Sequence, residues 1–171
     1  MTAWAMLVTT VHSTSIPISK TATTIWDPIN GNSGQKSIPG ALIRYTVTIS
    51  NAGTASASAT LTQISDALSG NLTIDADLKV PAACGAPPCA LASLADESAA
   101  GSGFKATVGG TSTRAGFPKY YTTTSSADGV DFASPNITAT MSTVLPVEAG
   151  YVAVQLKPGE SVTLTFNVTV N

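Results

Sequence analysis

Residues 162–170 read VTLTFNVTV, and apolar and polar side chains alternate along the whole stretch. Successive side chains of a β-strand point to opposite faces, so this alternation predicts a strand with one buried face and one polar face. Strands of this kind are typical of antiparallel sheets, in which only one face is covered. The expected buried face consists of Val162, Leu164, Phe166, Val168 and Val170.

A second stretch, residues 41–50, shows the same alternation, with Ile43, Tyr45, Val47 and Ile49 on its apolar face. Segments rich in Gly, Asn and Pro divide the rest of the chain into short pieces, as turns do. Many short strands at such spacing predict an all-β fold, an antiparallel β-sandwich with Greek-key connections. Further strands are expected at 19–26, 57–65, 72–80, 137–145 and 151–156.

The middle of the chain, residues 81–135, shows less regular patterning. We expect an irregular insertion there, at one end of the sandwich, with a short helix near residues 93–100. This segment contains Cys84 and Cys89 in the loop CGAPPC. Two cysteines in a short Pro/Gly loop predict a local disulfide and an oxidising compartment. A zinc site would need further thiols or imidazoles, and a redox pair usually has Cys-x-x-Cys spacing.

The composition indicates a weakly charged surface. Charged residues make up 11% of the 171 residues, against ~25% in ordinary soluble domains. A net charge of −2 creates no field that attracts a polyanion, so nucleic-acid binding is not expected. Because charge repulsion keeps free monomers apart, such a surface better suits a polymer, a surface layer or a module of a longer surface protein. An ordinary secreted monomer is the alternative.

Several motifs resemble the conserved-repeat family of prokaryotic cell-surface proteins, which is catalogued only as a domain of unknown function. The resemblance covers residues 18–66 and 151–171. It implies an immunoglobulin-like β-sandwich in a cell-surface or secreted protein, and it implies no enzyme activity. The motifs are ISKT at 18–21, DPING at 27–31, IPGA at 38–41, RYTVT at 44–48, NAGT at 51–54 and LKPGESVTLTF at 156–166.

The beginning of the chain, residues 3–11, reads AWAMLVTTV and is strongly apolar. A signal peptide is not favoured, because no basic segment precedes the apolar run and the A-x-A at residues 3–5 comes before it. A membrane span needs ~20 apolar residues, and polar residues interrupt this run after fewer. A strand remains, with Trp4, Met6 and Val8 on one face.

We divide the chain into an arm, residues 1–18, and a sandwich domain, residues 19–171. The arm could fold back as an extra strand of its own sandwich, or it could complete the sheet of a neighbouring copy by donor-strand addition. We favour donation, because the predicted sandwich is complete from residue 19 onward and the polar residues 12–15 resemble a spacer. Head-to-tail donation propagates into a filament. The expected donor residues are Trp4, Met6, Leu7, Val8 and Val11.

Catalytic constellations are hard to find in this sequence, and we do not expect an enzyme, a cofactor or a bound metal. The one histidine, His12, lies in the predicted spacer and offers no triad. A weak calcium site at Asp75 and Asp77 stays open. Asp27 is better explained as a turn residue, whose side chain bonds to nearby backbone groups, than as a ligand in a calcium loop. Tyr120 and Tyr121 either form a surface on which a sugar stacks or pack against other residues of the protein.

Covalent modification gives two further, weaker expectations. Three sequons match the glycosylation acceptor pattern, at Asn71, Asn136 and Asn167. An amide bond from Lys20 to Asn167 or Asn171 would resemble the welds of some sandwich pilins, but it also requires a buried acid beside it, and the sequence shows no convincing candidate.

The sequence thus predicts a structural subunit of an extracellular, pilus-like filament that polymerises through its N-terminal arm. The alternative is a secreted adhesin or carbohydrate-binding module of a cell-surface protein. The expected partners are other copies of the chain, with a surface ligand or glycan as a further class. Membrane insertion is not expected.

Overall fold

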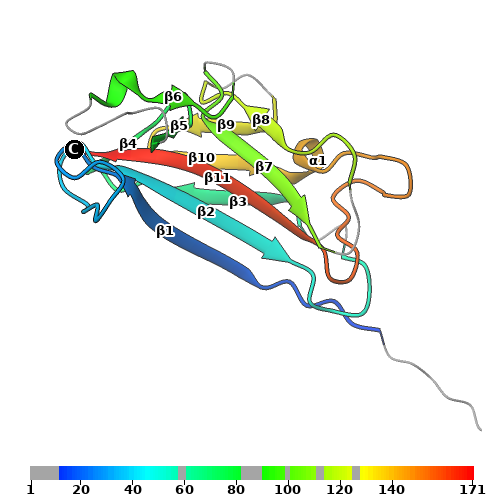
Figure 1. The fold of residues 1–171 in the computed structure, drawn as a ribbon. Coiled ribbons are helices and arrows are strands. Elements are labelled where there is room, and N and C mark those ends of the chain that lie inside the picture. The colour runs from blue at the N-terminus through cyan, green and yellow to red at the C-terminus, as the bar shows by residue number, and fades with distance from the viewer. Residues whose placement is uncertain (1–11, 58–60, 82–89, 99–100, 111–113, 125–127) are drawn as a thin grey trace, which may run out of the picture.

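The computed structural model describes residues 12–57, 61–81, 90–98, 101–110, 114–124 and 128–171. They form two main antiparallel sheets, which Figure 1 shows as two layers. The larger sheet has the order β1-β2-β11-β7-β8, and β4 also pairs with β11. Its strands are β1 (Ile18–Trp26), β2 (Leu42–Ser50), β4 (Leu72–Ile74), β7 (Phe104–Gly109), β8 (Lys119–Tyr121) and β11 (Ser161–Val170).

The second sheet has the order β3-β10-β9. Its strands are β3 (Gln63–Ala67), β10 (Asn136–Thr140) and β9 (Val130–Ala133). A small ladder joins β5 (Lys79–Val80) to β6 (Ala95–Asp96), and the helical pieces are a 3-10 turn at Leu91–Ser93 and α1 (Met141–Val144). The all-β sandwich predicted from the alternation is therefore confirmed.

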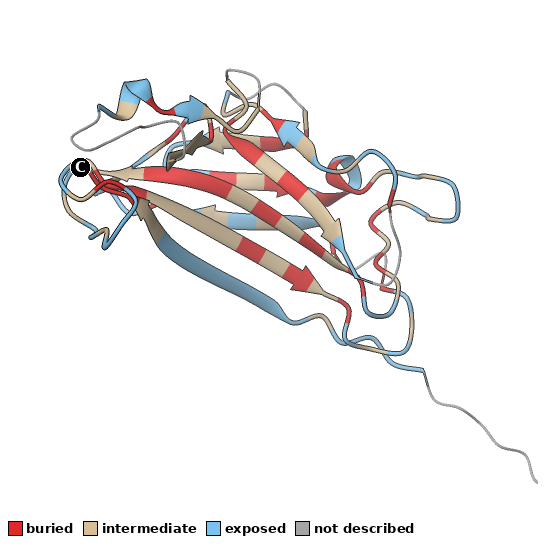
Figure 2. Ribbon diagram, in the orientation of Figure 1, coloured by how far each residue is buried: buried red, intermediate tan, exposed pale blue. Residues whose placement is uncertain are grey.

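Strand β11 is the central strand of the larger sheet, with β2 on one side and β7 on the other. Leu164 lies opposite Val47 of β2 and Ala106 of β7, and all three are buried. Phe166 is fully buried and contacts two other rings, stacking on Tyr45 and meeting Phe104 edge-on. Of the predicted buried face, only Val170 at the strand end is not buried. Figure 2 shows the resulting alternation along β2 and β11.

The prediction that residues 81–135 form an irregular insertion is wrong in part, because three strands of the sandwich lie in this range. Strand β7 pairs along its whole length with β11, β8 extends the same sheet, and β9 pairs with β10. The alternation in β7 is easily missed because one of its core positions is the small residue Ala106. The expected helix at 93–100 is also wrong, since β6 lies within that range. Cys84 and Cys89 lie outside the described residues.

The other predicted strands are right in part. Residues 19–26 and 41–50 correspond to β1 and β2. Residues 137–145 split into β10 and α1, and this single helical turn lets both Met141 and Val144 reach the core. Residues 151–156 are not a strand but a turn segment whose Leu156 forms one bridge to Ala57.

Candidate functional site

One long side of the sandwich ends in two edge strands with a cavity between them. Among the described residues, strand β1 pairs only with β2, and β3 of the other sheet pairs only with β10. A cavity of about 330 Å³ lies between these edges. We call it the edge groove; its lining residues are Ile18, Lys20, Val47, Ile49, Gln63, Ile64, Ser65 and Asp66.

The floor of the edge groove is part of the hydrophobic core. Val47 and Ile49 are 4% and 1% exposed, so they belong to the interior. Their partners across the ladder are Lys20 and Ile18, and paired residues of neighbouring strands face the same side of a sheet. Ile18 and Lys20 therefore point toward the space between the sheets, although Ile18 is 66% exposed.

An ion pair crosses the groove from one sheet to the other. The ammonium of Lys20 donates to both carboxylate oxygens of Asp66, at 2.7 and 2.6 Å. The same Nζ atom lies 4.5 Å from the centre of the Tyr45 ring. Lys20 thus lies above the aromatic part of the core while its charge is paired with β3.

Within the part of the chain that the structure describes, the backbone of β1 has one hydrogen-bonding edge without a partner strand, beside this groove. Ser50 N–H donates to the carbonyl of Pro17, so Pro17 faces β2. Because the backbone groups of an antiparallel strand alternate between its two sides, those of Ile18, Lys20 and Ala22 face away from β2. Figure 2 shows β1 as mostly exposed, in agreement with the burial of its residues.

The chain before β1 is fixed along the turn that follows β2. The carbonyl of Ser15 accepts from Ala52 N–H, and that of Ser13 accepts from Thr54 N–H at 2.8 Å. Gly53 permits this approach, since a Cβ there would lie 2.3 Å from the Ser13 carbonyl oxygen. Residues 12–17 therefore extend past the end of β2.

This extension lies at the opposite end of the sandwich from the C-terminus. Ile18 pairs with Ile49, near the end of β2, whereas Thr169 pairs with Leu42, at its beginning. Figure 1 shows the same arrangement, with the C-terminus at the far end of the molecule. The predicted donor residues Trp4, Met6, Leu7, Val8 and Val11 lie outside the described residues.

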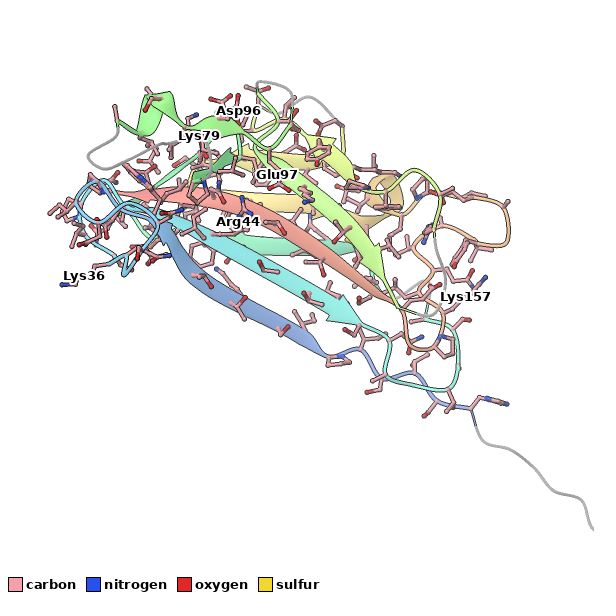
Figure 3. The ribbon with its side chains drawn as sticks, viewed as in Figure 1. Lys36, Arg44, Lys79, Asp96, Glu97 and Lys157 are labelled. Atoms are coloured by element: carbon pink, nitrogen blue, oxygen red, sulfur yellow. The ribbon has the colours of Figure 1, made fainter. Side chains whose placement is uncertain are left out.

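A charged cluster covers the outer face of the larger sheet, away from the edge groove, as Figure 3 shows for Arg44, Lys79 and Glu97. Asn167 is fully buried there, accepts from Arg44 Nε at 3.0 Å and donates to the carbonyl of Lys79 at 2.6 Å. Arg44 also pairs with Glu97 at 3.2 Å. The burial of Asn167 excludes it as a glycan acceptor, whereas Asn71 and Asn136 are exposed.

The carboxylates Asp75 and Asp77 in this cluster already have a cation, the ammonium of Lys79, at 3.4 and 2.7 Å. The hydrogen bond from Lys79, with another from Gly101 N–H, lowers the pKa of Asp77. Burial alone would lower the pKa of Lys79, but its bonds to the two aspartates raise it. Among the described residues, no three His, Cys, Asp or Glu side chains gather as metal ligands would. The geometry therefore favours an internal ion pair over a calcium site.

An amide bond from Lys20 to Asn167 is not supported, because the two residues lie on opposite faces of the larger sheet. Lys20 faces the groove, and Asn167 faces the charged cluster. Asn171 is engaged instead with Thr73, whose hydroxyl donates to it at 2.7 Å.

The remaining candidate residues make contacts within the fold itself. Tyr121 is 5% exposed and packs in the core, so the tyrosine pair does not form a sugar-stacking surface; burial and the nearby Asp128 raise its pKa to about 12. Burial would raise the pKa of Asp27, but its bonds to Asn30 and to two further backbone N–H groups lower it to about 2. His12 lies near the carbonyl of Thr54.

Sequence reasoning missed Lys20, Asp66 and Gly53 as parts of this site. A signal for Lys20 was present, because a lysine with the same parity as Ile18 points toward the interior. The pairing of Lys20 with Asp66 depends on how two sheets meet, which a local pattern does not encode.

No described helix has the length and apolar character that a membrane crossing requires. Comparisons of the chain with protein-family models, curated proteins and solved structures found no match.

Proposed function

We propose that this protein is the structural subunit of an extracellular filament, in which the N-terminal arm of one copy enters the edge groove of the next. The observation that carries this proposal is the edge groove itself. It joins an unpaired strand edge to an opening onto the hydrophobic core. Such an edge is a template for strand addition.

The direction of residues 12–17 favours donation over folding back. Ser13 and Ser15 are held beside residues 52–54, so a reversal of the chain can begin only before residue 12. A hairpin with its two-residue turn at 10–11 would set Val8 opposite Ser13 and Trp4 opposite Pro17. These apolar side chains would then lie short of the groove, which begins at Ile18.

A donated strand can satisfy both kinds of group that the groove presents. Its backbone would pair with the free groups of Ile18, Lys20 and Ala22, each hydrogen bond contributing ~0.5–1.5 kcal/mol. Trp4, Met6 and Val8 lie on one strand face, and burying each contributes ~1.5–3 kcal/mol. Ordering the arm costs ~1–2 kcal/mol per residue. Loss of one apolar anchor should therefore weaken docking about tenfold or more.

An extracellular location and an immunoglobulin-like classification of the sandwich form part of the same proposal. Both are supported by the low charge of the chain and by the resemblance of residues 18–66 and 151–171 to a surface-protein family. Neither the extracellular location nor the immunoglobulin-like classification requires an enzymatic activity.

Electron microscopy of the purified full chain tests this function with a matched pair of variants. The variant with Met6→Asp and Val8→Asp puts two charges on the face that enters the groove, and we expect no filaments. The variant with Ala5→Asp and Thr9→Asp puts the same two charges on the solvent face, and we expect filaments. Equal behaviour of the two variants, or a wild-type chain that stays monomeric at all concentrations, would contradict the proposal.

A second candidate function, the binding of a surface ligand or glycan, has one specific observation in its favour. A cavity of about 650 Å³ lies at the C-terminal end of the sandwich, beside Thr73, Asp77 and Asn171. Selective binding to one glycan on an array, lost in Asp77→Ala, would support this second function. Absence of binding to any glycan on the array would contradict it.

A further inference from the structure

The ion pair between Lys20 and Asp66 occupies the place where a donor strand would enter. Lys20 belongs to β1 of the larger sheet, and Asp66 belongs to β3 of the smaller sheet. No ladder joins these two strands among the described residues. The ion pair is thus a polar link between the two edges, and its side chains are 38% and 17% exposed.

The two charges point toward the interior rather than away from it. Lys20 faces the same side as Ile18, and Asp66 shares its face of β3 with Ile64. Inward-pointing charges on edge strands are a known protection against unwanted strand pairing, because an incoming apolar strand would have to desolvate them. Here they lie above an apolar floor formed by Val47 and Ile49.

We propose that the Lys20–Asp66 ion pair is a latch on the edge groove, which slows the entry of a donor strand and so controls when assembly occurs. This inference rests on the proposed filament function. The latch holds β1 against β3 in the free subunit, and the arriving arm must break or cover the pair before its apolar side chains reach Val47 and Ile49.

The test measures strand uptake by a full-length acceptor chain that cannot donate, because it carries Met6→Asp and Val8→Asp. The donor is a fluorescently labelled synthetic peptide with the sequence of residues 2–11, and its uptake is followed by fluorescence anisotropy. Lys20→Met and Asp66→Asn each remove one charge of the latch with little change in volume. We expect each to raise the uptake rate about fivefold, equivalent to about 1 kcal/mol, and to remove the acceleration by salt expected of the unmodified latch.

Two further variants serve as controls. Lys119→Met removes a lysine of similar exposure whose ion pair with Glu148 lies away from the groove, and it should leave the rate unchanged. Exchanging the charges, with Lys20→Asp and Asp66→Lys together, should return the rate toward that of the unmodified latch. The exchange also tests the latch if one of the single variants fails to fold.

The outcomes separate the two proposals. Equal uptake rates with an intact and a broken ion pair would overturn the latch and leave the filament function standing. An increase in uptake rate in Lys119→Met equal to that in Lys20→Met would have the same consequence. Absence of peptide uptake by every acceptor would overturn the groove as a strand-binding site, and the latch with it.

Discussion

Gly53 shows how one residue without a side chain can determine the direction of a chain segment. Any Cβ at this position would lie 2.3 Å from the carbonyl oxygen of Ser13 and 2.7 Å from the nitrogen of Ser15. Both are backbone atoms, so they cannot rotate away. The segment that connects the arm to β1 therefore depends on a glycine in the turn after β2.

Gly53→Ala should release residues 12–15 from this turn and cost about 1–3 kcal/mol in the free energy of unfolding. Hydrogen exchange should become faster at the amides of Ala52 and Thr54, which donate to that segment. Gly70→Ala is the matched control, because nothing lies within 4 Å of its added Cβ. Equal protection of the two amides in wild type and Gly53→Ala would show that the close contact does not hold the segment.

Asp27 predicts a defined pH dependence of stability. Its pKa is about 2 in the folded chain, against an ordinary value of 3.8. Between these values the unfolded chain binds more protons at this residue, so the contribution of Asp27 to stability is complete above pH 3.8 and is lost as the pH falls toward 2. Denaturant titrations at several pH values should show this loss in wild type.

Asp27→Asn should reduce the pH slope in that window, because its side chain does not ionise. It should also be less stable at pH 7, since an amide NH₂ would face donors such as Lys36 N–H, which now lies 2.7 Å from Oδ2. An unchanged slope in this variant would mean that other carboxylates account for acid sensitivity.

Among the strands, those with large apolar residues at alternate positions were predictable from local pattern. Strands β2 and β11 carry such residues, and both were found within a residue or two of their bounds. Strand β7 uses Ala106 in the core, and α1 interrupts the alternation of apolar and polar residues that begins in β10. In these two cases the packing of the whole core, which local sequence does not specify, decided the structure.

On the central strand, substitution of Phe166 should cost more stability than substitution of its neighbour Thr165. Phe166→Ala removes a fully buried ring that packs on Tyr45 and Phe104, and should cost about 3–5 kcal/mol. Its neighbour Thr165 points to the other face and is half-buried. Thr165→Ala should cost less than about 1 kcal/mol. Thermal unfolding followed by circular dichroism compares the two, and similar losses would contradict the assignment of faces.

At the scale of the whole molecule, the decisive feature is that two sheets leave one side open. The sequence predicted a sandwich and an apolar arm, but it could not predict which strands form the edges. That property follows from the long-range pairing of β1 with β2 and of β3 with β10. The edge groove and the ion pair of Lys20 with Asp66 could therefore be recognised only in three dimensions.

The central claim is that the arm of one copy lies in the edge groove of another, and isotope-coded photo-cross-linking tests it most directly. Equal amounts of ¹⁵N-labelled and unlabelled full-length chain, both with a photoreactive phenylalanine analogue in place of Met6, are assembled, irradiated and digested for mass spectrometry. We predict cross-links from position 6 to peptides that contain Ile18–Lys20 or Gln63–Asp66, half of them between chains of different isotope. Cross-links found only within chains of one isotope, or only outside these groove peptides, would contradict the account.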